Sequence, residues 1–141
     1  TRPFEMVGAP FIDPYRLADR LADYRLAGVV FRPVYFEPTF NKHARRLCGG
    51  VFLHVTDRGA FRPYHTSLAL LQAVAQLWPD EFRFKEPPYE YETVRRPMDL
   101  ILGRSNLADL VVRGDDLAGL EAGWADELAR FSTEAESHHL Y

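Results

Sequence analysis

A short basic run is the clearest chemical anomaly of this sequence. Lys42, His43, Arg45 and Arg46 fall within five positions of a chain whose net charge is −3. Lysine and arginine presented together from a loop can hold a carboxylate or a phosphate through charge-assisted hydrogen bonds. A solvated turn whose cations keep the surface soluble has the same composition, and spacing alone favours this second interpretation.

The other groups capable of chemistry are weaker candidates. Glu90 and Glu92 have the spacing of neighbours on one strand face, and a carboxyl pair can act as general acid and base. A solvated face opposite two packed tyrosines is the stronger interpretation. His54 lies mid-strand, where a lone histidine is more often a hydrogen-bonded core residue than a catalyst. Cys48 is the only cysteine, so no intramolecular disulfide can form, and catalysis by its thiol is disfavoured.

Ligand patterns for a metal or an organic cofactor are missing from the sequence. It contains no glycine-rich phosphate loop, nucleophile elbow, paired-cysteine zinc pattern or HExxH motif. The adjacent His138 and His139 would point apart on a helix and have no third ligand. The net charge of −3 gives no reason to expect a nucleic-acid partner, and no apolar run approaches the roughly 20 residues of a membrane span. We therefore expect no cofactor, no nucleic acid and no membrane span.

Two strands should flank the basic run and position it. Residues 31–36 and 51–56 are rich in the aromatic and β-branched residues that favour strands. Because side chains alternate along a strand, Arg32 and Tyr35 should lie on opposite faces of the first one. Pro33 cannot donate to a ladder, so this strand is expected at a sheet edge or with a bulge.

The remaining elements predict an α+β fold. Asp13-Pro14 should open a helix, because aspartate caps free amides and proline suits the first helical position. The chain of 141 residues can support its own core, and we expect a small, mostly antiparallel or mixed sheet of about four strands, packed with helices, with a helical C-terminal third. Further extended candidates are residues 1–10, 81–85 and 89–92. The last helix should bury one apolar stripe: Leu117, Leu120, Trp124, Leu128 and Phe131.

Several stretches of the chain together resemble one known family. They are TRPFEMVGAPFID, FRPVYFEPTFNKHARRLCGGVFLHVTD, PPYEYE, RPMDLILG and the terminal Leu-Tyr after a Trp-containing helix. Their order and spacing are similar to those of the C-terminal domain of the bacterial exo-β-N-acetylmuramidase family, the NamZ type. The resemblance runs from Thr1 to about Gly103 and continues more loosely to the end, where Ser132 to His139 departs from the more basic family pattern.

This resemblance implies a glycoside hydrolase that releases N-acetylmuramic acid from the non-reducing end of peptidoglycan fragments. It also implies a larger N-terminal Rossmann-like domain that carries the catalytic carboxylate, while the smaller domain helps to shape the cleft. Residues 1–141 are then expected to form a single domain, the C-terminal one of a two-domain protein, and to be inactive alone. The expected partners are the missing catalytic domain and a peptidoglycan-derived sugar.

The residues expected on the cleft wall are polar groups of the extended segments and the basic run: Arg2, Glu5, Arg32, Tyr35, Lys42 and His54. N-acetylmuramic acid carries a lactyl carboxylate, which arginine or lysine can bind. Sugar hydrolysis usually needs two carboxyl groups, and nothing places Glu5 opposite Glu37, so no catalytic residue is assigned. Two alternatives stay open: a docking domain that never touches sugar, and a self-contained module that binds cell-wall fragments.

Overall fold

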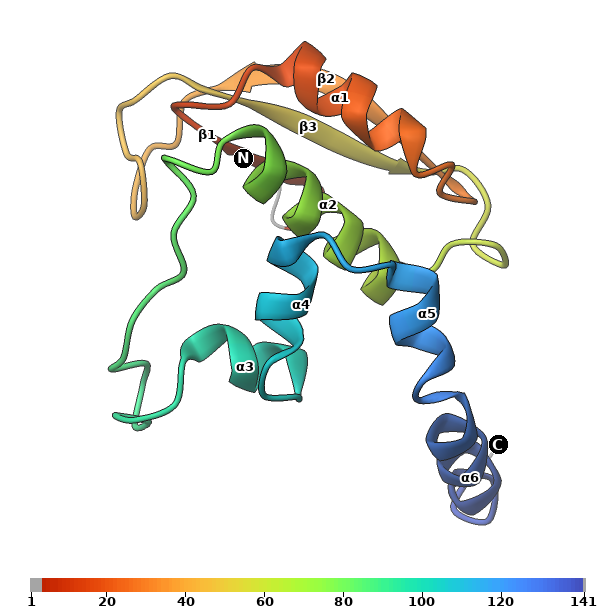
Figure 1. Cartoon of the computed structure of the whole chain (residues 1–141). Coiled ribbons are helices and arrows are strands. Elements are labelled where there is room, and N and C mark those ends of the chain that lie inside the picture. The colour runs from red at the N-terminus through yellow and green to blue at the C-terminus, as the bar shows by residue number, and fades with distance from the viewer. Residues whose placement is uncertain (1–3, 141) are drawn as a thin grey trace.

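The computed structural model describes residues 4–140, so the candidate Arg2 lies outside the described residues. In chain order the elements are β1 (Met6–Ala9), α1 (Pro14–Asp23), β2 (Val29–Phe36), β3 (Cys48–Val55), α2 (Pro63–Leu77), α3 (Pro97–Leu102), α4 (Leu107–Arg113), α5 (Leu117–Ala122) and α6 (Ala125–Glu136). In Figure 1 the sheet and α1 form the upper part of the molecule, α2 runs beneath them, and α3 to α6 follow below. The expected α+β class with a helical C-terminal part is confirmed.

The sheet is antiparallel, with the strand order β1-β3-β2. β2 is thus an edge strand, which confirms the position expected from Pro33. The described residues form three strands where about four were expected. The difference lies in the segment from residue 80 to residue 96, which follows the end of α2 and makes only an isolated bridge between Tyr89 and Glu92.

Local signals explain where α1 begins and what it buries. The Asp13 carboxylate accepts hydrogen bonds of 2.9 Å from the N–H groups of Tyr15 and Arg16, and proline occupies the first helical position. One turn apart, Leu17 and Leu21 are fully buried. The Asp13-Pro14 prediction is therefore confirmed.

The two faces of the sheet have different surroundings. On one face, Val51 of β3 packs in a cluster with Leu17 of α1 and Ala73 of α2. The opposite face is open: Val30 is 55% exposed, and Arg32 and His54 are exposed as well. This division follows the alternation of side chains along β2 and β3.

Close backbone approach at the start of β3 depends on glycine. A Cβ atom on Gly49 would lie 2.1 Å from the Ile12 carbonyl oxygen, and one on Gly50 would lie 2.0 Å from the Val7 carbonyl oxygen. Both obstacles are backbone atoms, which cannot turn aside. The glycine pair therefore allows β1 and the residues that lead into α1 to lie very close to the backbone of β3.

A second apolar cluster joins α2 to the C-terminal helices: Leu68, Ala69, Leu107, Val111 and Leu117. The buried Gln72 side chain sits between this cluster and the sheet half. It accepts a 2.8 Å hydrogen bond from the Tyr24 hydroxyl and donates 3.0 Å bonds to the carbonyls of Val111 and Asp115. All polar atoms of this amide are thus engaged, and the two halves of the molecule are joined through it.

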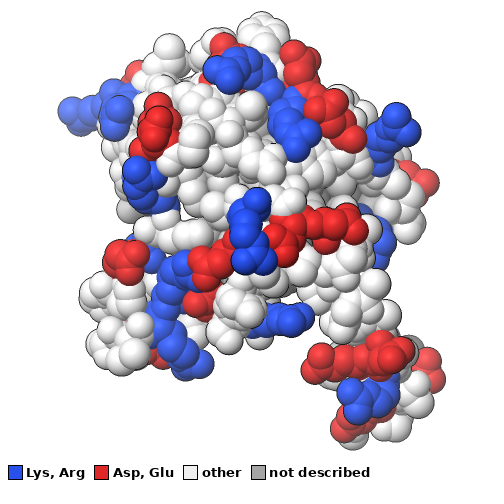
Figure 2. Space-filling model, viewed as in Figure 1, with Lys and Arg blue, Asp and Glu red and all other residues white. Residues whose placement is uncertain are grey.

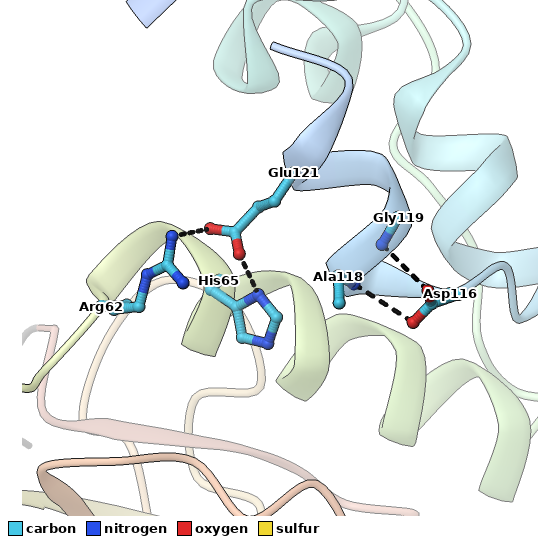
Figure 3. A network of polar contacts seen from close by, with 6 residues as sticks. All are labelled: Arg62, His65, Asp116, Ala118, Gly119 and Glu121. Carbon is cyan, nitrogen blue, oxygen red and sulfur yellow. Dashed lines mark hydrogen bonds and ion pairs between the residues drawn. The ribbon is translucent and has the colours of Figure 1, made fainter. Parts of the chain in front are cut away.

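A polar network ties α5 to the start of α2 (Figure 3). One carboxylate oxygen of Glu121 lies 2.9 Å from Nδ1 of His65, and the other lies 3.1 Å from the Arg62 guanidinium. The Glu121 side chain is only 14% exposed. In the same view, Asp116 caps the start of α5 through two backbone N–H groups. This network and the cap anchor α5 on the body of the molecule.

The predicted continuous buried stripe of the last helix is wrong. The helix is interrupted at Gly123 and Trp124, where the Trp124 ring meets the Tyr64 ring edge-on at 6.0 Å. Beyond this contact α6 buries none of its residues: Leu128 is 58% exposed and Phe131 is 65% exposed. Figure 1 shows α6 projecting away from the sheet, and Figure 2 shows mainly acidic side chains on it. The helical spacing of these residues does place apolar side chains on one face, but no element of the described chain covers that face.

Candidate functional site

A groove with a volume of about 870 Å³ lies beside β1. Four parts of the chain line it: β1 itself with the turn after it, the loop that follows β2, the middle of α2, and residues 81–83. Because β1 is the edge strand of the sheet on this side, the groove runs along a strand edge.

The groove wall is largely apolar and depends on one glycine. Its apolar lining includes Phe11, Phe36, Leu70, Val74 and Phe82. A Cβ atom on Gly8 would lie 2.3 Å from the Gly49 carbonyl oxygen and 2.8 Å from Cε1 of Phe36. The Phe36 ring can therefore lie against β1 only because residue 8 has no side chain.

The basic loop contributes Lys42 and His43 to the groove lining. Asn41, His43 and Arg45 have positive φ angles of 60°, 62° and 58°, which is uncommon for residues other than glycine. The turn is held by a 2.8 Å hydrogen bond from the Arg45 N–H to the Pro38 carbonyl. Backbone strain of this kind persists where the surrounding structure enforces it. As a result Lys42 and His43 line the groove, while Arg45 does not belong to its lining.

The electrostatics of the loop differ between its residues. Burial and, next, the charges of Lys42 and Arg46 lower the pKa of His43 below its ordinary value. The His43 imidazole is therefore held neutral at pH 7, able to donate and to accept a hydrogen bond. A cationic lysine beside a neutral imidazole suits an anionic ligand that also carries hydroxyl groups.

Segment 81–83 closes the far side of the groove. The Arg83 guanidinium donates a 2.8 Å hydrogen bond to the Pro79 carbonyl and another to the Phe82 carbonyl. These bonds hold a second cation at the groove. Glu81 lies on the same wall and is the one carboxylate among the described lining residues.

Of the residues predicted for the cleft, the structure places Lys42 in this groove and brings Arg32 and His54 together elsewhere. On the open sheet face, Nε of Arg32 lies 3.4 Å from Nε2 of His54, and its guanidinium lies 5.3 Å from the Phe52 ring centre. The His54 ring lies 4.3 Å from the same phenylalanine. We call Arg32, Phe52 and His54 the open-face cluster.

The remaining predicted residues do not join the groove. Tyr35 is exposed on the face of β2 opposite Arg32, as its alternation predicts. Glu5 directly precedes β1, and its backbone carbonyl accepts a 2.8 Å hydrogen bond from the Leu53 N–H. Neither residue belongs to the groove lining. Their role on a cleft wall stays a prediction.

The weaker candidates from the sequence have structural explanations. Hydrogen bonds from the backbone N–H groups of Arg95 and Val94, and from the Arg95 side chain, lower the pKa of Glu92 to about 2. Glu92 is therefore an ionised turn cap near neutral pH and not an acid catalyst there. Cys48 is fully buried, and burial raises the pKa of its thiol, which disfavours a nucleophilic thiolate.

Sequence reasoning missed the parts of the groove made by β1, by the end of β2 and by segment 81–83. The residues not singled out are Met6, Gly8, Phe36, Phe82 and Arg83. A glycine in the middle of an extended segment can signal a close approach by another part of the chain. Gly8 carried that signal, but its partner Phe36 is far away in the sequence.

Within residues 4–140, no group of three or more His, Cys, Asp or Glu side chains is arranged to hold a metal ion. No helix of that part of the chain is long and apolar enough to cross a membrane.

Comparison with known proteins agrees with the resemblance seen in the sequence. A family model described as "Exo-beta-N-acetylmuramidase NamZ, C-terminal" matches residues 1–141. A curated relative, the peptidoglycan beta-N-acetylmuramidase NamZ of Bacillus subtilis (strain 168), is 32% identical over 141 residues, which is 100% of this chain and 32% of the relative. A crystal structure of a DUF1343 family protein from Bacteroides fragilis NCTC 9343 has the same fold. It matches with a TM-score of 0.82 at 24% identity, over 100% of this chain and 36% of that one. The chain thus spans about a third of the length of these proteins.

Proposed function

The chain belongs to the family of C-terminal domains of the exo-β-N-acetylmuramidase NamZ, and from this premise we propose that it is the cleft-shaping domain of a peptidoglycan-fragment hydrolase. The proposed enzyme releases N-acetylmuramic acid from the non-reducing end of its substrate. The single observation that carries this proposal is the groove beside β1, which combines Lys42 with an apolar, aromatic wall.

The groove has the chemistry that a muramic sugar requires. Its volume of about 870 Å³ lies in the range of small-molecule sites. The lactyl carboxylate of the sugar pairs with the Lys42 ammonium, and the neutral His43 imidazole serves a hydroxyl group. The less polar face of the sugar ring lies against an aromatic side chain, for which Phe36 and Phe40 are available.

Catalysis requires a second part of the protein. Glycoside hydrolysis usually uses two carboxyl groups on opposite sides of the scissile bond. The described groove lining offers only Glu81. In this proposal a larger N-terminal Rossmann-like domain supplies the catalytic carboxylate, residues 1–141 form the C-terminal domain of the two-domain protein, and the isolated chain has no hydrolase activity.

Exposed apolar side chains support a missing partner domain. The large apolar residues exposed outside the strands and on α6 include Phe4, Phe40, Leu47, Tyr91, Val94, Leu128 and Phe131. Exposed apolar side chains of this kind are expected where a partner domain covers them. We therefore expect the isolated chain to self-associate. Light scattering over a concentration series checks this, and a monomer at every concentration would contradict it.

The test of the proposed function is the Lys42→Ala substitution in the full-length protein, with Arg45→Ala as the matched control. Both substitutions remove one cation from the same loop, but only Lys42 lines the groove. Loss of one charge-assisted hydrogen bond should lower kcat/KM on a chromogenic N-acetylmuraminide about tenfold. Arg45→Ala should change kcat/KM less than about twofold, the effect of a surface charge. Both variants should keep the wild-type Tm.

The second candidate is a docking domain, favoured by the uncovered stripe of α6. A docking domain would respond to Lys42→Ala with unchanged specific activity. The third candidate, a self-contained binding module, predicts that the isolated chain binds N-acetylmuramic acid in preference to N-acetylglucosamine. An amide-shift titration of the isolated chain with both sugars separates it from the other two.

A further inference from the structure

The outer edge of β1 presents unused backbone groups along the groove. The Leu53 N–H donates to the Glu5 carbonyl at 2.8 Å, so residues 5 and 53 form a hydrogen-bonded pair of the antiparallel ladder. Such pairs alternate, and the register therefore makes Val7 and Ala9 the next residues that bond to β3. Met6 and Gly8, between them, direct their N–H and C=O groups away from β3.

These outward groups face the groove, since Met6 and Gly8 both line it and β1 is the edge of the sheet. No described residue of the chain makes a hydrogen bond to either of them outside the ladder. An unpaired strand edge is a template for another extended amide. Here the edge is only four residues long and lies in a groove, next to Lys42.

We propose that the edge of β1 binds the 2-acetamido group of the sugar, whose carbonyl oxygen accepts a hydrogen bond from the outward backbone N–H of Met6 or Gly8. This inference rests on the proposed function and names how its site recognises the N-acetyl group. An acetamido group has one N–H and one C=O, as a peptide unit has. Because the N–H and C=O of a trans amide point in opposite directions, only one of them can bond to the edge, and the carbonyl oxygen meets an outward N–H as the carbonyl of a neighbouring strand would.

The surroundings of the edge suit the rest of the acetamido group. Its methyl group needs an apolar contact, and Phe11, Phe36 and Val74 line the same groove. Lys42 lies at the loop side of the groove, so the two substituents that define N-acetylmuramic acid have separate binding groups. The ammonium binds the lactyl carboxylate, and the strand edge binds the amide.

Hydrogen exchange in the full-length protein measures the proposed contact without any substitution. The Met6 and Gly8 amides should exchange fast in the free protein, and those of Val7 and Ala9 should be protected. Saturating N-acetylmuramic acid should slow exchange at Met6 or Gly8 about tenfold. The matched probe is 3-O-lactyl-glucose, which keeps the carboxylate and has a hydroxyl in place of the acetamido group. It should leave exchange at both amides unchanged.

The kinetic test compares Met6→Pro with Met6→Leu. Proline removes the outward N–H and is tolerated at a strand edge, whereas leucine keeps the N–H and most of the side-chain volume. On the nitrophenyl glycosides of the two sugars, wild type and Met6→Leu should prefer the N-acetyl substrate. Met6→Pro should reduce this preference about fivefold, the contribution of one neutral hydrogen bond.

Each outcome of these tests decides a different question. An unchanged preference in a folded Met6→Pro variant, together with unchanged exchange at both amides, overturns the proposed contact while the hydrolase function stands. Equal protection by both sugars also overturns it. Protection of Met6 and Gly8 in the full-length protein without any sugar would show that another segment already pairs with the edge, which also overturns the proposed contact. Absence of wild-type turnover on the N-acetylmuraminide refutes the proposed function itself.

Discussion

The groove beside β1 and the open face of the sheet both hold cations that the sequence singled out, yet only the groove forms a concave site. Lys42 lines a cavity with an apolar wall and a neutral histidine beside it. Arg32 lies on the open face, with its guanidinium 5.3 Å from the Phe52 ring centre and its Nε 3.4 Å from Nε2 of His54. The comparison indicates that a cationic side chain becomes a candidate binding group where a loop places it beside a strand edge, whether it is a lysine or an arginine.

The largest effect should come from filling the groove wall at Gly8. In Gly8→Ala the new Cβ would meet the Gly49 carbonyl at 2.3 Å and the Phe36 ring at 2.8 Å. Overpacking against backbone should lower the free energy of unfolding by about 3 kcal/mol. Val30→Ala on the open face, where the side chain is 55% exposed, is the control and should change it by less than about 1 kcal/mol. Urea denaturation measures both. Equal losses would mean that the open face is packed against something as tightly as the groove wall.

The second prediction compares how one substitution in each of the two regions changes kcat/KM. Lys42→Ala should lower kcat/KM of the full-length enzyme about tenfold, while Arg32→Ala should lower it less than about twofold, since Arg32 is exposed outside the groove. A tenfold loss in Arg32→Ala at unchanged Tm would place the open-face cluster on the cleft wall as well. His54→Ala would then be expected to show a similar loss, because its ring is the partner of Arg32.

The smallest effect concerns the titration of His43. Its pKa is lowered in the folded chain, so the unfolded state binds more protons as the pH falls below about 6.5. The contribution of His43 to stability is therefore complete above that pH and is lost as the pH falls toward the folded pKa. Lys42→Ala removes one of the charges that lower this pKa, and an NMR titration of the imidazole should show a higher midpoint. Arg32→Ala, on the other face, should leave the midpoint in place.

Much of the fold could be predicted from the sequence because its signals are local. The Asp13-Pro14 helix start, the alternation of Arg32 and Tyr35, and the edge position of Pro33 all agree with the structure. The stripe through Leu128 and Phe131 was also a local signal, and it was wrong as evidence of burial. Periodicity describes one face of a helix but does not provide an element to cover it.

The candidate site could be predicted only in part. Lys42 was found because a basic run is visible in the sequence, whereas Gly8 and Arg83 were not, since their significance comes from contacts with distant residues. Arg32 and His54 were each named as candidates, but their contact depends on the register that pairs β2 with β3.

The sequence by itself determined the α+β class, the strand faces, the helix start and the family, because composition, spacing and motif order are properties of the chain alone. The tertiary structure decided which polar groups meet. The groove exists because the loop after β2, with its three positive φ angles, and segment 81–83 fold against the edge of β1. The physical reason is that a concave site needs packing between segments far apart in the chain, and no local pattern encodes that distance.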